Sequence, residues 1–469
     1  MAMQRIALGF LVVMLTVTCI TSCAFEPQTK PPRLPDHGQV FLYLSCPRRS
    51  AVEISFAVSA ISFLSENGEW IDVALERHIH SARASGRQIK LSESYLPAGK
   101  YVRMKWTFSE ATLKKGSKAV VLTLPEPGGE HFLGIEFMVF RQESLALFVD
   151  LNPNESIVDE DRFRPEMAIR KQGIEITNIL LYVTNPGSDC VTVIDRQLDR
   201  VVATIAAGES PMGIVTSQDR SRVYVANSGS NNISVIDTAA NRVMTTIDNF
   251  GYGPAELALS GDGQRLYATN PDADNVSVID TVSNTVVRRI PVGRRPAGIA
   301  VDQERRKIYV ANSGSNSVSI IDMERGAEEE AVTVGLYPTG LAIHDKKLYV
   351  ANSGSNNVSV LEIPAYSVTM IIPVGQRPLW IHSGLSGWIY VSIAGNNEIA
   401  FIYASTDIVP RNILVGDAPS RMAVDTLRKK LYVVNSLSDD LSVIDLTTRK
   451  VKAVIQVGKR PHGITLVEE

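Results

Sequence analysis

The strongest constraint on the fold is a segment that repeats seven times in the C-terminal part of the chain. Seven tyrosines recur at intervals of 40 to 43 residues, at Tyr182, Tyr224, Tyr267, Tyr309, Tyr349, Tyr390 and Tyr432. Each opens a unit that reads approximately YVANSGSNNVSVID, then a second apolar stretch, then VGxxPxGIAV. Four short strands separated by turns, repeated at this period, are typical of a β-propeller. We therefore expect residues 171–469 to form a propeller of seven blades.

The two ends of the repeat region predict how the ring closes. The first unit begins at its tyrosine strand, with no PxGIAV stretch before it, whereas residues 461–467 (PHGITLV) carry that pattern just before the end of the sequence. Pairing these two segments would remove an exposed strand edge. We expect the C-terminal strand to complete the first blade as its innermost strand.

These units resemble the YVTN family of β-propeller repeats, and the resemblance recurs seven times over about 290 residues. It implies the same propeller that the period predicts. Some propellers are lactonases or lyases, so the fold by itself does not exclude catalysis.

Residues 39–170 form a second body in this prediction. Short stretches rich in β-branched and aromatic residues alternate with turn signals, which favours a β-sandwich. The segments LPAGKY at 96–101, VDLN at 149–152 and Arg164-Pro165 resemble a prealbumin-like domain of bacterial lipoproteins. The chain departs from that pattern at Cys46, which precedes Pro47 where the family usually has an Asp-containing step. The overall fold class is thus all-β, a β-sandwich followed by a seven-bladed propeller.

The first 23 residues have the composition of an export signal. A basic residue precedes an apolar stretch over residues 6–20, too short to span a bilayer comfortably. Ile20-Thr21-Ser22-Cys23 resembles the lipobox of bacterial lipoproteins, which implies that Cys23 carries the lipid. Multiple acyl chains would anchor the protein stably in a membrane. In a cell with two membranes, Ala24 after the cysteine implies the outer one, and residues 24–38 are expected to be a Pro-rich tether.

Composition and motifs exclude several functions. The net charge is −3 and charged residues make up 21% of the chain, so no nucleic-acid partner is expected. Haem-attachment, nucleophile-elbow, zinc-protease and P-loop motifs do not occur, and we predict no cofactor and no metal. We interpret His78 and His80 as polar strand residues and Asp272 and Asp274 as turn residues. Cys46 and Cys190 are expected to be free thiols rather than a disulfide.

Comparing the seven units singles out one position, the glycine of PxG, where the innermost strand begins. Its occupants are Gly213, Glu256, Gly298, Gly340, Trp380, Arg421 and Gly463. His462 lies beside the last of these, and Arg377 and Arg460 precede prolines in the same sector. This basic and aromatic sector suits an anionic or sugar-like ligand. The alternative is drift in a tolerant repeat, with the arginines as solvated turn residues.

The expected function is that of a monomeric binding or scaffold lipoprotein of the cell envelope, with a protein or glycan partner on the loop face of the propeller. The alternative is an envelope hydrolase or lyase of lactonase type, with Glu256 and His462 as acid and base. Those two residues come from blades two steps apart, so the sequence does not lead us to expect direct contact between them.

Overall fold

The computed structural model describes residues 35–46, 52–76, 79–82, 88–115, 118–173, 179–248 and 253–467. Residues 35–469 form one compact unit. Over the described ranges its elements are strands, apart from the 3₁₀ turn η1 (Leu385–Gly387), so the fold is all-β. Within the described ranges, no helix has the length and apolar character to cross a membrane. The export signal, Cys23 and most of the tether lie outside the described residues.

The N-terminal part contains two main sheets that share one hydrophobic core. The first has the order β12-β9-β1-β5, built from β1 (His37–Ser45), β5 (Gln88–Pro97), β9 (Ser144–Leu151) and β12 (Met167–Lys171). The second contains β2 (Glu53–Ser65), β3 (Trp70–Asp72), β4 (Ile79–Ala82), β6 (Gly99–Lys115), β7 (Lys118–Val121) and β8 (Glu130–Val139). A short pair, β10 (Ile157–Val158) and β11 (Arg162–Phe163), follows. Leu42 from the first sheet and Trp106 from the second belong to the common core.

Side-chain alternation explains why these segments become strands. In β6, Met104, Trp106 and Phe108 are buried while the residues between them are partly exposed, as a period of two requires. The structure differs from the prediction at the start of this body, because strand β1 begins at His37, inside the predicted tether. Its partner β9 runs parallel to it.

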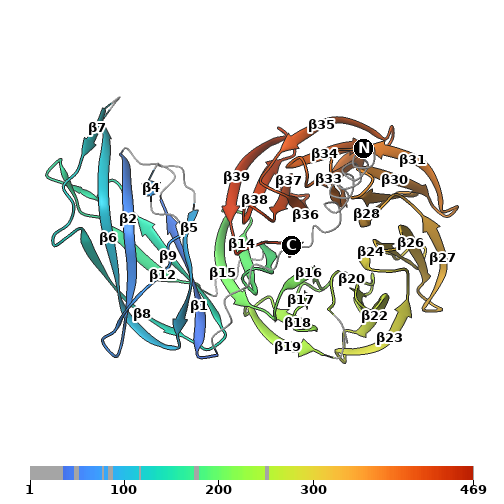
Figure 1. Cartoon of the computed structure of the whole chain (residues 1–469), viewed down its shortest axis with the longest axis horizontal. Coiled ribbons are helices and arrows are strands. Elements are labelled where there is room, and N and C mark those ends of the chain that lie inside the picture. Colours follow the sequence, from blue (N-terminus) through green and yellow to red (C-terminus); the bar gives the residue numbers. More distant parts are fainter. Residues whose placement is uncertain are drawn as a thin grey trace, which may run out of the picture. The chain divides into compact units, whose positions relative to one another are not determined.

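The described residues from 179 onward form seven four-stranded antiparallel sheets, and Figure 1 shows them around a common centre, which is a β-propeller. The first sheet contains β13 (Leu180–Asn185), β14 (Cys190–Asp195), β15 (Arg200–Ala206) and β40 (Ile464–Leu466). The second and third contain β16 (Pro211–Thr216), β17 (Arg222–Asn227), β18 (Asn232–Asp237), β19 (Arg242–Ile247), β20 (Leu257–Leu259), β21 (Arg265–Asn270), β22 (Asn275–Asp280) and β23 (Thr285–Pro291).

The other four sheets have the same order of consecutive strands. The fourth and fifth contain β24 (Pro296–Asp302), β25 (Lys307–Asn312), β26 (Ser317–Asp322), β27 (Ala327–Thr333), β28 (Pro338–His344), β29 (Lys347–Asn352), β30 (Asn357–Glu362) and β31 (Ser367–Pro373). The sixth and seventh contain β32 (Pro378–Ser383), β33 (Trp388–Ile393), β34 (Glu398–Tyr403), β35 (Ile408–Leu414), β36 (Pro419–Asp425), β37 (Lys430–Asn435), β38 (Asp440–Asp445) and β39 (Lys450–Gln456).

The repeated residues have specific jobs in these sheets. The repeat tyrosines are buried. Asp237 Oδ1 accepts hydrogen bonds from the backbone amides of Ala239 and Ala240, which fixes the turn after β18. Asn227 donates through Nδ2 to Ser234 Oγ at 2.9 Å inside the sheet. Asp274 Oδ1 accepts from the amide of Arg295 at 2.8 Å, which confirms it as a loop-forming residue.

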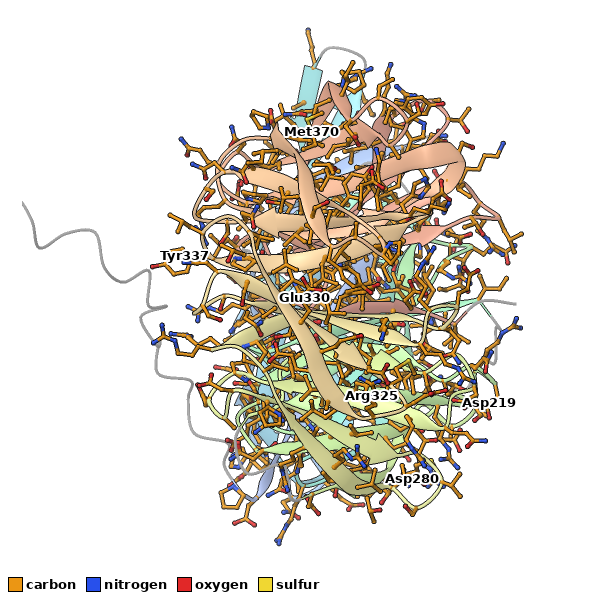
Figure 2. The ribbon with its side chains drawn as sticks, turned by 90° about the vertical axis from the view of Figure 1, so that its right-hand side faces the viewer. Asp219, Asp280, Arg325, Glu330, Tyr337 and Met370 are labelled. Atoms are coloured by element: carbon orange, nitrogen blue, oxygen red, sulfur yellow. The ribbon has the colours of Figure 1, made fainter. Side chains whose placement is uncertain are left out.

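The propeller has two faces, which we name by their loops. The loop face carries the NSGSNN segments and the PxG segments that start the inner strands, and the turn face carries the turns that follow the VID segments. Figure 2 shows Tyr337 from the loop face at the left edge and Asp219 and Asp280 from the turn face at the right.

The C-terminal strand completes the first sheet, as the ends of the repeat region predicted. Strand β40 pairs with β13, with Val183 opposite Ile464 and Leu181 opposite Leu466. A buried arginine secures this join: Arg196 donates to Asp425 Oδ2 and to the carbonyl of Val467, both at 2.8 Å. The side chains of Arg196 and Asp425 are each 1% exposed. The first and seventh sheets and the end of the chain are thus tied together.

The first sheet of the propeller also contacts the N-terminal sheets. Gln88 pairs with the backbone of Val201 in β15, accepting from its amide at 2.9 Å and donating to its carbonyl at 3.2 Å. Tyr43 and Phe148 share a core cluster with Cys190 and its neighbours. The edge of β15 is thereby covered rather than left open. Cys46 and Cys190 are both buried free thiols.

Candidate functional site

The PxG glycines mark the places where inner strands of neighbouring sheets come closest. A Cβ atom added to Gly213 would collide with the backbone of Ala255 and Glu256, and one added to Gly340 would collide with that of Trp380. Glycine therefore permits close approach of one inner strand to the next. Because these strands surround the centre in Figure 1, the larger residues at this position stand where the sheets converge.

Glu256 is the centre of a cluster of side chains that come from four different sheets. It lies just before β20 and is buried, with 9% of its side chain exposed. Its Oε1 forms an ion pair with Arg421 of β36 and lies 3.3 Å from Nε2 of His462, which precedes β40. The guanidinium of Arg421 lies 3.6 Å from the ring centroid of Trp380 in β32, which is the geometry of a cation–π contact. We call Glu256, Trp380, Arg421 and His462 the mouth cluster.

The contact between His462 and Glu256 corrects the expectation that two sheets of separation would keep them apart. The strand between theirs carries Gly213 at the equivalent position, so no side chain stands there. Two long side chains on either side of a glycine can therefore meet. Near the centre of the propeller these two side chains are close together, although their strands are two sheets apart around the ring.

Burial and neighbouring charges have opposing effects on the pKa values of Glu256 and His462. Burial acts to raise the pKa of Glu256, but the charge of Arg421 and the hydrogen bond from His462 outweigh it, and the pKa is lowered. Burial and the charge of Arg421 lower the pKa of His462 despite the nearby carboxylate. At neutral pH, Glu256 is thus ionised and His462 is neutral, donating from Nε2. The carboxylate compensates the charge of Arg421, so the cluster is not the basic site that the sequence indicated.

The backbone amides of Arg377 and Arg460 donate hydrogen bonds to side chains of neighbouring loops. The amide of Arg377 donates to Asn356 Oδ1 at 3.0 Å, and that of Arg460 donates to Asp439 Oδ1 at 2.7 Å. Both have φ near +50°, as do the corresponding residues Ser210, Arg295, Tyr337 and Ala418. The contacts of the mouth cluster described above bring together four of the six candidates, Glu256, Trp380, Arg421 and His462.

A set of hydroxyl side chains that the sequence analysis did not identify accepts hydrogen bonds from the backbone of the mouth cluster. These residues stand just before the Asn of YVAN, or its equivalent, in the first, third and sixth units. Thr269 Oγ1 accepts from the amide of Glu256 at 3.0 Å, and Ser392 Oγ accepts from that of Trp380 at 3.0 Å. Thr184 Oγ1 accepts from the amide of Gly463, next to His462, at 2.7 Å.

The signal for these hydroxyls was present in the repeats. The second, fourth and fifth units, which keep glycine at PxG, have alanine at this position: Ala226, Ala311 and Ala351. Hydroxyl and departure from glycine thus coincide in the third and sixth units. In these two units the residue at the glycine position of PxG contacts the position that carries the hydroxyl.

The described part of the chain contains no group of three His, Cys, Asp or Glu side chains close enough together to hold a metal ion. His78 lies outside the described residues, so the histidine pair stays untested.

Comparisons with known proteins agree with the propeller. Residues 174–305 match the family model of the YNCE-like beta-propeller. No curated protein sequence matches the chain. Among solved structures, it is similar to a hydrazine synthase from Kuenenia stuttgartiensis, with 19% identity, a TM-score of 0.53 and coverage of 57% of this chain and 92% of that one.

Two further structures are similar over nearly their whole length. One is a protein of unknown function from Desulfotomaculum acetoxidans, with 16% identity and a TM-score of 0.54, covering 61% of this chain and 98% of that one. The other is a candidate 6-phosphogluconolactonase from Bacteroides uniformis, with 16% identity and a TM-score of 0.54, covering 62% and 100%. Identities this low show the fold alone.

Proposed function

We propose that this protein is an exported lipoprotein of the cell envelope that binds a glycan-type ligand or partner at the loop face of a seven-bladed propeller. In this account each four-stranded sheet is one blade, and residues 39–170 form a β-sandwich of the prealbumin-like type. Cys23 carries the lipid anchor and Ala24 directs the protein to the outer membrane. The propeller acts as a monomer and makes no use of nucleic acid.

The observation that carries this proposal is the arrangement of the mouth cluster. Three of the seven units have replaced the glycine of PxG, and two of these replacements pair with each other while the third stacks on one of them. Random drift would not bring an acidic, a basic and an aromatic side chain from separate sheets into one network of contacts. Such a combination is typical of sites that orient a polar ligand.

The charge balance favours a hydroxyl-rich ligand over a simple anion. Arg421 and His462 both contact Oε1 of the Glu256 carboxylate, so neither of them occupies Oε2. His462 and Arg421 are 22% and 13% exposed, so ligand atoms can reach them. A carboxylate acceptor, a neutral imidazole and an indole ring together suit sugar hydroxyls and a sugar face.

A ligand screen tests the binding proposal. The purified full-length protein in detergent is screened for thermal stabilisation by glycan fragments, neutral sugars and sugar acids. Binding is then compared in the Trp380→Ala/Arg421→Ala double variant. Arg411→Ala, an exposed arginine on the outer strand β35, is the matched control. A ligand that stabilises the double variant as much as the unchanged protein would remove the mouth cluster from the account.

Export and anchoring need a separate test. Cells that express Cys23→Ser should release the protein from the outer-membrane fraction, since the acylated thiol is lost. Equal membrane association of the two forms would contradict the anchor.

A second candidate, hydrolysis of a lactone-type substrate, is favoured by the contact between Glu256 and His462. A carboxylate that orients a neutral imidazole is a recurring way to prepare a general base. Turnover of 6-phosphogluconolactone that falls at least 100-fold in both Glu256→Gln and His462→Ala would support it. Absence of turnover in the unchanged protein would leave the binding role alone.

A further inference from the structure

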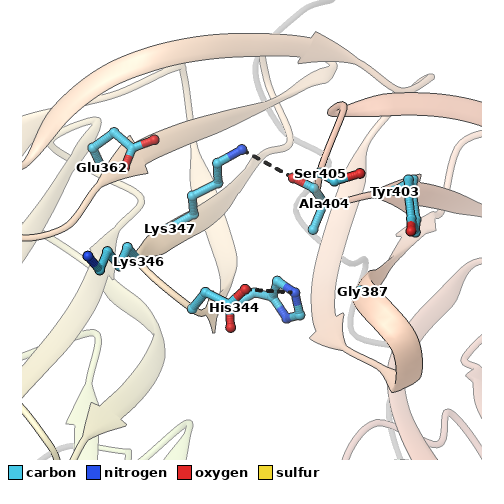
Figure 3. A pocket seen from close by; sticks show the side chains of 9 residues that line it. His344, Lys346, Lys347, Glu362, Gly387, Tyr403, Ala404 and Ser405 are labelled. Carbon is cyan, nitrogen blue, oxygen red and sulfur yellow. Dashed lines mark hydrogen bonds and ion pairs between the residues drawn. The ribbon is translucent and has the colours of Figure 1, made fainter.

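A second site lies on the turn face, between the fifth and sixth sheets, at the strand ends remote from the mouth cluster. It is a cavity of about 410 Å³. Figure 3 shows Lys346, Lys347 and Glu362 of the fifth sheet on one side and Tyr403 and Ala404 of the sixth on the other. A cavity of this size is within the range of small-molecule sites.

One turn that lines the cavity is shorter than its counterparts in two other sheets. Two residues, Asp345 and Lys346, join β28 to β29, whereas residues 303–306 join β24 to β25 and residues 426–429 join β36 to β37. In the fourth sheet the longer turn includes Arg305, which folds back onto Asp302 at 2.8 Å. The fifth sheet lacks this longer turn, and His344 stands where Asp302 does.

The opposite wall is also an exception among the repeats. Five units have Asp at the end of the VID segment and one has Glu362, but the sixth has Tyr403. In the fourth unit, Asp322 Oδ1 accepts the amides of Glu324 and Arg325 to form the turn. Tyr403 supplies no such acceptor from its side chain, and its turn is closed by its own backbone carbonyl, which accepts from Asp407 at 2.8 Å. The tyrosine ring is therefore not needed for the turn.

The polar groups of the cavity are fixed in place by contacts between the two sheets. Lys347 Nζ donates to the carbonyl of Ala404 at 3.2 Å and forms an ion pair with Asp407 at 2.7 Å. The Nδ1 atom of His344 lies 3.0 Å from Ser383 Oγ, which holds the imidazole ring. A cavity held rigid in this way loses little entropy when it binds a ligand.

The composition of the lining selects the kind of ligand. The lining contains two lysines, Lys346 and Lys347, and two carboxylates, Asp345 and Glu362, so neither sign of charge is in excess among them. Tyr403 is 40% exposed and its ring lies 5.1 Å from that of Trp388. An exposed aromatic ring beside several hydrogen-bonding groups, without excess charge, is suited to a neutral polyhydroxylated ring.

We propose that this turn-face cavity binds a neutral saccharide, with the sugar ring against Tyr403 and its hydroxyls toward His344, Lys346 and Glu362. The site shares no residue with the mouth cluster, and it lies at the other ends of the strands.

The repeats provide a matched experiment. Full-length protein is titrated with neutral mono- and disaccharides, including glucose, galactose, N-acetylglucosamine and maltose, by calorimetry. Tyr403→Asp restores the residue found in five other units and should preserve folding while it weakens binding at least tenfold. Tyr403→Phe keeps the ring and should stay within threefold of the unchanged protein. Equal affinity in Tyr403→Asp, or no binding of any neutral sugar to the unchanged protein, overturns the proposal.

A second variant tests the cavity rather than the ring. Replacing residues 345–346 with the four-residue sequence of 303–306 should fill the space and abolish binding while the melting temperature is kept. The sugar binding that Tyr403→Asp removes should remain in the Trp380→Ala/Arg421→Ala variant, because that variant alters only the mouth cluster. Binding of inorganic phosphate but of no neutral sugar, or unchanged binding after the turn is lengthened, contradicts the assignment.

Discussion

His462 and Glu256 are 206 residues apart in the chain, and the Nε2 of one lies 3.3 Å from the Oε1 of the other. His462 precedes the strand that completes the first sheet, while Glu256 precedes the inner strand of the third. The end of the chain therefore contributes both to ring closure and to the mouth cluster. Stability and the chemistry of this site should respond together to changes in either residue.

The first prediction concerns pH. The pKa of His462 is lowered in the folded protein, whereas in the unfolded chain a histidine titrates near its ordinary value of about 6.5. Below that value the unfolded chain binds the proton first, so the free energy of unfolding should fall between pH 7 and pH 5. His462→Gln removes this contribution and should reduce the loss by about 1 kcal/mol. Urea unfolding at pH 7 and pH 5 measures it.

His382 provides the comparison, because it is a second histidine whose pKa burial lowers. Its contribution should remain in the His462 variant, so some acid sensitivity persists. An identical pH dependence in both proteins would show that His462 is not held neutral in the fold.

The second prediction concerns the ion pair of Arg421. Arg421→Ala leaves the nearly buried carboxylate of Glu256 without its cation, which should cost about 3 kcal/mol of unfolding free energy. The Glu256→Gln/Arg421→Ala double variant should recover part of this loss, because the buried charge is gone. Denaturant unfolding of both variants measures the difference. Arg411→Ala should change stability by less than about 0.5 kcal/mol, and a loss for Arg421→Ala no larger than that would contradict the pairing.

The third prediction concerns the arginine that secures the ring. Arg196→Met removes the bonds to Asp425 and Val467 and leaves a buried carboxylate, so we expect a loss of about 3 to 5 kcal/mol. Amide exchange in β40 should accelerate before that of other inner strands. Arg428→Ala is the control, since Arg428 is 25% exposed and contacts the same carboxylate at 3.4 Å. Similar effects of the two variants would contradict the special role of Arg196.

The fourth prediction concerns the last residues of the chain. Deleting residues 460–469 removes β40 and leaves β13 with an exposed edge, in addition to removing His462. We expect a lower melting temperature for the whole propeller, because the sheets surround one centre and support each other. A truncated protein with an unchanged melting temperature would refute closure by this strand.

The sequence predicted the elements whose cause is local and repeated. The tyrosine period located the four-stranded sheets, and the missing inner strand of the first unit predicted the pairing of β40 with β13. Comparison of units also located Glu256, Trp380 and Arg421, because a large residue in a glycine column is visible without any structure. Strand β5 (Gln88–Pro97) carries a weaker sequence signal, because Lys90, Ser92 and Ser94 make it polar, although all three are buried in the structure.

The remaining features depend on distances that no single unit determines. The contact between Glu256 and His462 requires the absence of a side chain at Gly213, in the second sheet, which lies between theirs. The bonds of Arg196 reach Asp425 and Val467 at separations of 229 and 271 residues. The turn-face cavity is lined by the short turn of one unit and by Tyr403 of the next. Each is a relation between units, which a comparison position by position does not show.

The central claim is that the mouth cluster binds the ligand, and calorimetry with Glu256→Gln tests it most directly. This variant keeps the shape of the side chain and removes the charge that pairs with Arg421. For the tightest ligand of the screen, we predict an affinity at least tenfold weaker in Glu256→Gln and in Trp380→Ala/Arg421→Ala, and unchanged in Arg411→Ala. Equal affinity in all four proteins, or no glycan-type ligand bound by the unchanged protein, would contradict it.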